Sequence, residues 1–86
     1  MSRRRLPAAL TTGRPRSDWR LWRACCDGRE PAEALTTRDR EDLVRLLWDC
    51  GWTDGEIAVH TRLTDYTAAR IRTRLGLVAN TLPSAA

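Results

Sequence analysis

The chain lacks most of the residues and patterns on which small enzymes and metal proteins depend. It has 86 residues, with no Lys, no Phe and a single histidine, His60. Its three cysteines, Cys25, Cys26 and Cys50, do not have a zinc or iron–sulfur spacing, because two adjacent cysteines rarely both reach one tetrahedral ion. We find no glycine-rich phosphate loop, no paired catalytic carboxylates and no nucleophile beside a base. The sequence therefore predicts no metal, no cofactor and no enzymatic activity, with Cys26 and Cys50 as small core residues.

Long apolar runs are absent as well. No stretch approaches the roughly 20 residues that cross a bilayer, and the N-terminus lacks the apolar centre of a secretory signal. A chain of this size buries roughly 60% of its extended surface, which suffices for one small domain and leaves no room for a deep cleft. We therefore expect a single cytoplasmic domain that does not enter a membrane.

What the chain does have is arginine, and it is unevenly placed. All fifteen basic residues are Arg, and the net charge is +4. Residues 1–30 hold eight Arg and three acids, residues 31–60 hold three and seven, and residues 61–86 hold four and one. Genomic base composition would explain the choice of Arg over Lys, but it does not explain this placement. Two positive ends around an acidic middle are typical of a protein that binds a polyanion.

Two short helices with their own start signals are predicted between residues 52 and 77. Thr53 and Glu56 have the spacing of a capping box, and Trp52 and Ile57 that of a hydrophobic staple. Thr64 is the N-cap of the second helix, and Gly76 is its left-handed stop. The apolar residues between these signals have the spacing of a helix-turn-helix: Ile57, Ala58, Thr61, Leu63, Ala68 and Ile71.

The turn of this motif contains an unusual residue. Arg62 stands where such motifs carry Gly, because the backbone needs a positive φ there. We therefore expect strain or a modified turn at Arg62.

Two further helices are predicted upstream. Ser17 would cap a helix from Asp18 to about Asp27, with Trp19, Trp22 and Cys26 on one stripe. A connector with Pro31 leads to a helix from about Thr37 to Cys50, whose core stripe is Leu43, Leu46, Leu47 and Cys50. We take Arg40, Glu41 and His60 to be solvated. The fold class is then all-α: a small bundle of about four helices containing a tri-helical helix-turn-helix, over residues 17–77.

The ends flanking this domain have different compositions. From these compositions we expect a flexible basic arm over residues 1–16 and a disordered tail over residues 78–86. Within the arm, Gly13-Arg14-Pro15-Arg16 would let Arg14 and Arg16 enter the minor groove of A·T-rich DNA. The same four residues open the DNA-binding domain of Hin-type invertases and resemble the core of an AT-hook. The alternative is a solvated arm without a groove contact.

Residues 35–77, about half of the chain, resemble the helix-turn-helix domains of LuxR/NarL-type regulators and region four of sigma factors. One extra residue between Glu41 and Leu46 and a shorter second helix favour the wider tri-helical class, as in small actinobacterial or phage regulators. The resemblance implies double-stranded DNA as the partner. It rests on Leu35-Thr36, Arg38, Arg40-Glu41, Leu46-Leu47, Gly51-Trp52-Thr53-Asp54, Glu56-Ile57-Ala58, Thr67 and Leu75-Gly76-Leu77.

The helix after the turn supplies the predicted DNA-binding residues. If Ala68, Ile71 and Leu75 face the core, the helical period puts Tyr66, Ala69, Arg70 and Thr73 on the opposite face. Arg70 is the residue we expect to bind guanine, because its fork matches the O6 and N7 atoms. The alternative is that the arginines of this helix only solvate it and complement its dipole. The flanking and helix-start residues predicted to contact DNA, mainly its phosphates, are Thr53, Thr64, Asp65, Arg72 and Arg74.

The sequence thus predicts sequence-specific binding of double-stranded DNA by a small transcription regulator, with helix 65–75 in the major groove. A single motif has a small footprint, so tight binding would need either a homodimer, with helix 18–27 as the suspected contact, or added contacts from the arm. The alternative function is a protein-interaction module that docks on RNA polymerase or another regulator. Its surface would be the cluster of Trp19, Trp22 and Trp48.

Overall fold

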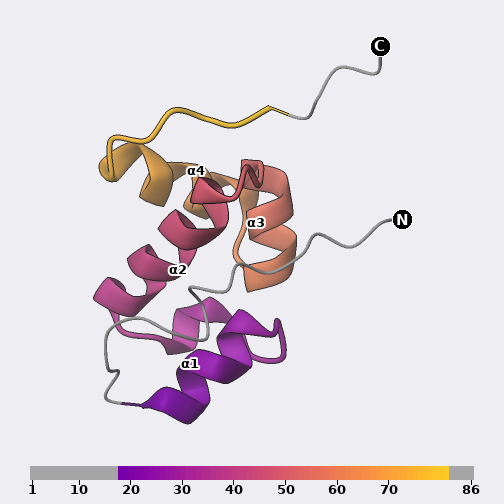
Figure 1. Cartoon of the computed structure of the whole chain (residues 1–86), viewed down its shortest axis with the longest axis vertical. Helices are drawn as coiled ribbons and strands as arrows, with labels where there is room; N and C mark the ends of the chain where they lie inside the picture. Colours follow the sequence, from indigo (N-terminus) through magenta and orange to yellow (C-terminus); the bar gives the residue numbers. More distant parts are fainter. Residues whose placement is uncertain (1–17, 82–86) are drawn as a thin grey trace.

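The computed structural model describes residues 18–81, and these form an all-α domain (Figure 1). The predicted fold class is therefore confirmed. The predicted arm, residues 1–16, and residues 82–86 of the predicted tail lie outside the described part. Within residues 18–81 there are four α-helices and one 3-10 turn, without strands: α1 (Trp19–Cys26), η2 (Ala32–Ala34), α2 (Thr37–Asp49), α3 (Asp54–Thr61) and α4 (Asp65–Arg74).

Each α-helix begins where a side chain binds a backbone N–H of the first turn. Thr36, Thr53 and Thr64 accept from the N–H groups three residues on, as an N-cap does. The predicted cap of the first helix is corrected: it is Asp18, whose carboxylate accepts from Leu21 N at 3.0 Å, so the helix begins one residue later than Asp18. A carboxylate at this place stabilises the helix through the same bond that Ser17 was expected to make.

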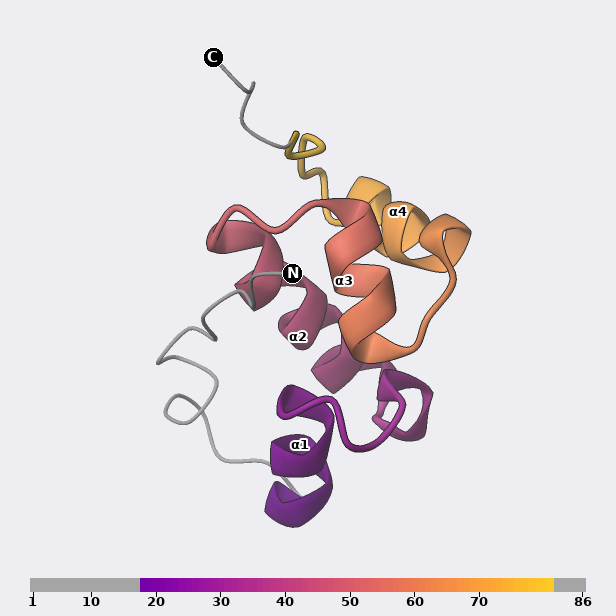
Figure 2. The ribbon, with the colours of Figure 1, turned by 90° about the vertical axis from the view of Figure 1, so that its right-hand side faces the viewer.

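Helix α2 lies between the other elements and carries the centre of the core (Figures 1 and 2). Leu43, Val44 and Leu47 are fully buried against Trp22 and Ile57. The prediction for Cys50 was wrong, because α2 ends at Asp49 and Cys50 is an exposed C-cap. The buried thiols are instead two neighbours on α1, Cys25 and Cys26.

His60 joins α3 to α1, which corrects its assignment as a solvated residue. Its Nε2 atom lies 2.7 Å from the carbonyl oxygen of Cys26, and its ring packs edge-on against Trp52 at a centroid distance of 5.2 Å. Gly28, at φ +76°, makes room for the ring, since a Cβ there would lie 3.2 Å from its Cε1 atom. The His60 ring and the space at Gly28 thus add a polar tie to the core packing that positions α1.

Arg40 is not a free surface charge either. Its guanidinium donates to the carbonyl oxygens of Ala32, Glu33 and Leu35 at 3.1–3.3 Å, which fixes η2 against the start of α2. A planar fork with five donors can satisfy several carbonyls at once, so this arginine acts as a structural tie.

The chain stays attached to the domain beyond α4. Trp48 Nε1 donates to the carbonyl of Val78 at 2.6 Å, and the Asn80 amide donates to the carbonyls of Trp48 and Trp52. These bonds attach residues 78–80 to α2 and to Trp52, beyond the domain boundary predicted at residue 77. The boundary could not be predicted locally, because the partners are distant in sequence. No helix in residues 18–81 is long and apolar enough to cross a membrane.

Candidate nucleic-acid interface

The unit formed by α3, the turn at residues 62–64 and α4 folds as its signals predict. The capping box is complete: Thr53 and Glu56 exchange hydrogen bonds of 2.9 and 3.2 Å. Thr61 is buried and closes α3 with a 2.6 Å bond to the carbonyl of Ile57. Arg62 then adopts φ 59° and ψ 27°, which confirms the expected left-handed turn. For a residue with a Cβ this conformation costs roughly 1–2 kcal/mol.

Helix α4 has one apolar and one polar face. Ala68 and Ile71 are buried against the other helices, as predicted. On the opposite face Tyr66 is 71% exposed, and Arg70 and Thr73 are exposed beside it. Ala69 is half-buried at the edge. The structure therefore brings the predicted reading residues together on one solvent-facing strip of about two turns.

The two arginines that follow Arg70 point to acids of the same chain. Arg72 Nε lies 2.8 and 3.0 Å from the carboxylate oxygens of Asp54, and its Nη1 atom donates to the carbonyl of Leu77 at 2.7 Å. Arg74 forms an ion pair with Glu41 at 2.6 Å. The first pair is largely covered, with side-chain exposures of 14% and 23%, and the second is more open, at 53% and 26%. Arg72 is thus placed as a brace between α3 and α4.

The predicted phosphate-binding groups at the helix starts are engaged as caps. Thr53 belongs to the capping box, and Thr64 Oγ1 accepts from the Thr67 N–H while donating to its hydroxyl. Asp65, in the first turn of α4, is exposed and adds a negative charge there. Arg14 and Arg16 lie outside the described residues.

Two arginines of this unit have no side-chain partner among residues 18–81. Neither Arg62 nor Arg70 makes an ion pair or hydrogen bond with another residue of the range 18–81 through its side chain, and both are exposed. Sequence reasoning had selected Arg70 but not Arg62. The signal for Arg62 was available, since a charged residue stood in a turn position that favours glycine.

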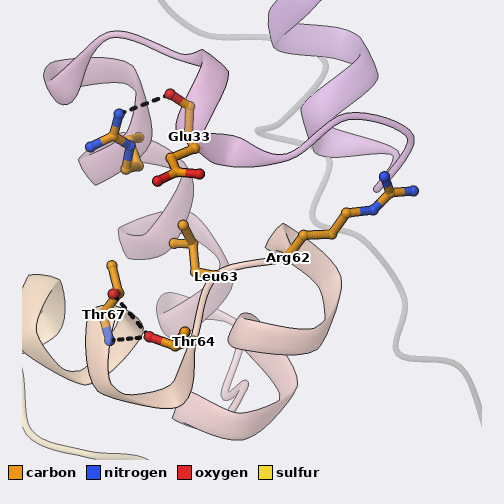
Figure 3. A pocket seen from close by; sticks show the side chains of 6 residues that line it. Glu33, Arg62, Leu63, Thr64 and Thr67 are labelled. Atoms are coloured by element: carbon orange, nitrogen blue, oxygen red, sulfur yellow. Dashed lines mark hydrogen bonds between the residues drawn. The ribbon is translucent and has the colours of Figure 1, made fainter.

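A shallow polar pocket of about 150 Å³ lies between η2 and the turn, and Figure 3 shows it. Its walls come from η2, α2, the turn and the first residues of α4: Glu33, Arg40, Arg62, Leu63, Thr64 and Thr67. In the view of Figure 3 the Arg62 side chain extends away from Glu33 and out of the pocket. Among the described residues no group of three His, Cys, Asp or Glu is placed to hold a metal ion.

The tryptophans predicted as an alternative surface do not form one continuous patch. Trp22 is fully buried, and Trp48 is half-buried with its indole N–H bound to Val78. Only Trp19 of the three is classed as exposed, at 40%. These rings serve mainly to close the core of a small domain.

No protein-family model, curated protein or solved structure matches the chain.

Proposed function

We propose that this protein binds double-stranded DNA in a sequence-specific way, as a small transcription regulator, with α3 and α4 as a helix-turn-helix. The observation that carries the proposal is the exposed strip of Tyr66, Arg70 and Thr73 on α4. Within residues 18–81 the guanidinium of Arg70, in the middle of this strip, has no polar partner, whereas those of Arg72 and Arg74 bind Asp54 and Glu41.

The chemistry of the strip suits the major groove, into which an α-helix fits. Arg70 would donate two hydrogen bonds to O6 and N7 of a guanine. Tyr66 would pack on a thymine methyl or bind a phosphate, and Thr73 would contact a base edge or phosphate. In this arrangement α3 crosses the backbone above α4. The brace between Arg72 and Asp54 keeps the angle between the two helices fixed.

The proposal is tested by selecting bound sequences from a pool of random duplex DNA with the full chain. A palindromic site would indicate a homodimer, and a half-site with an A·T-rich flank would implicate Arg14 and Arg16. Arg70→Ala should weaken binding to the selected site by roughly 1–3 kcal/mol and relax the preference at one base position.

The matched control is Arg20→Ala, an exposed arginine of α1, which lies at the opposite end of the molecule from α4 (Figures 1 and 2). This variant should keep the wild-type affinity and preference. If the wild-type chain enriches no sequence and shifts no duplex at low salt, the proposed function is refuted. A surface that docks on RNA polymerase is less well supported, because Trp22 is buried and cannot contribute to it.

A further inference from the structure

Arg62 occupies a backbone conformation that glycine adopts more easily. The other described residues with positive φ are Gly28, Gly51 and Gly76, so Arg62 is the one non-glycine among them. The Cβ atom crowds the following carbonyl in this region, and the residue is therefore strained. Such strained positions persist where the surrounding structure fixes them, and they cluster at functional sites.

Inside the described part of the chain, no polar partner explains an arginine at this position. The Arg62 side chain is exposed and forms no ion pair or hydrogen bond there. The acid of the adjoining pocket, Glu33, does not meet it, because the Arg62 side chain extends away from Glu33 (Figure 3). Glycine would adopt this turn at a lower cost, and residues 18–81 supply no polar partner that would favour arginine instead.

We propose that the Arg62 guanidinium binds a backbone phosphate of the DNA that α4 reads, an inference that rests on the proposed function. Arg62 precedes the N-cap Thr64 by two residues, so it stands beside the end of α4 that enters the groove. A guanidinium presents a planar fork of donors that fits phosphate oxygens.

Three variants of the full chain separate charge from backbone strain. Arg62→Gly relieves the backbone strain of the turn and also removes the charge. Arg62→Gln removes the charge and keeps the strain, and Arg62→Lys keeps both. Arg20→Gln is the control, since Arg20 is an equally exposed arginine on α1. Stability is measured by thermal unfolding, and binding by fluorescence anisotropy with a short labelled duplex of random sequence.

We expect stability and binding to move in opposite directions in Arg62→Gly. Its Tm should rise by about 4–8 °C, because relief of about 1 kcal/mol of backbone strain shifts the Tm by that amount in a domain of this size. Arg62→Gly and Arg62→Gln should both bind more weakly, with the slope of log affinity against log salt shallower by about 0.9. Their deficit should therefore shrink about threefold between about 50 and 200 mM salt. Arg62→Lys and Arg20→Gln should keep the wild-type slope.

Each contrary result has a distinct meaning. A wild-type slope in Arg62→Gln would overturn the phosphate contact and point to a protein partner for this arginine. A lower Tm in Arg62→Gly would overturn the premise that the turn is strained. Loss of all duplex binding by the wild-type chain itself would refute the proposed function, and the Arg62 contact with it.

Discussion

The ion pair between Arg72 and Asp54 gives the sharpest test of how α4, the helix proposed to read DNA, is held against α3. Both partners are largely covered, and Arg72 Nε lies within 3.0 Å of both carboxylate oxygens. Replacing Arg72 by Met keeps the apolar stem and removes the guanidinium. It leaves Asp54, with 23% of its side chain exposed, and the Leu77 carbonyl without their donor.

The magnitude follows from these contacts. Hydrogen bonds to charged groups contribute about 1.5–3 kcal/mol, and the remaining exposure of both side chains favours the lower end of that range. The bond from the guanidinium to the uncharged Leu77 carbonyl, which is only partly buried, adds about 0.5–1 kcal/mol. Arg72→Met should therefore lower the free energy of unfolding by about 2–3 kcal/mol. At about 4–8 °C per kcal/mol, the Tm falls by roughly 10–20 °C.

The assay is urea unfolding followed by tryptophan fluorescence, in a double-mutant cycle with Asp54→Asn. The coupling energy between the two substitutions should be about 1–2 kcal/mol. Arg74→Met is the matched control, because its pair with Glu41 is more exposed and should contribute about 0.2–1 kcal/mol. A coupling energy below about 0.3 kcal/mol, or equal costs at Arg72 and Arg74, would refute the reasoning.

The same variant separates bracing from phosphate binding. If Arg72 only holds α4 against α3, Arg72→Met should weaken DNA binding under folding conditions and leave its salt slope unchanged. A direct phosphate contact would instead make the slope shallower by about 0.9.

Two further predictions concern glycine and cysteine. Gly55→Ala should raise the free energy of unfolding by about 0.5–1 kcal/mol, because the glycine has no positive φ and a Cβ there would meet nothing within 4 Å. Gly28→Ala should lower it, since φ is +76° and the Cβ would press on His60, and urea unfolding would contradict both if the signs were reversed. Burial, together with the charge of Glu30, raises the pKa of the Cys25 thiol, so a thiol reagent at neutral pH should label the exposed Cys50 well before Cys25. The same shift favours the protonated thiol in the fold, so stability should hold below pH 9.0 and fall as the pH rises through the higher folded pKa, a loss that Cys25→Ala should reduce.

The parts of the fold that could be predicted from the sequence are those that depend on neighbours within one or two turns. The capping box of Thr53 and Glu56, the cap at Thr64 and the stop at Gly76 are all local patterns. The buried face of α4 followed in the same way, because the helical period alone places Ala68 and Ile71 together.

The parts that could not be predicted depend on contacts between distant residues. From the sequence, His60 is a polar residue near a helix end. Its contact with the carbonyl oxygen of Cys26, 34 positions away, depends on the packing of α3 on α1. Asn80 and Trp48 are separated by 32 positions, so nothing local indicated that the chain beyond residue 77 is tied to α2. Cys50 differs, since a boundary shifted by one residue moved it from the core to an exposed cap.

The arginines of the turn and α4 show why composition alone does not identify which charges are available to an external anion. Four arginines lie in the turn and α4, and by sequence each is a basic residue of the predicted helix-turn-helix. Two of the four are paired with acids distant in sequence. Arg72 binds Asp54, 18 positions away, and Arg74 binds Glu41, 33 positions away. The charge left for an external anion sits on Arg62 and Arg70, one in the strained turn and one on the exposed strip. If α4 binds DNA as proposed, a duplex that contacts both residues must lie along the exposed strip of α4 and reach the turn that precedes it.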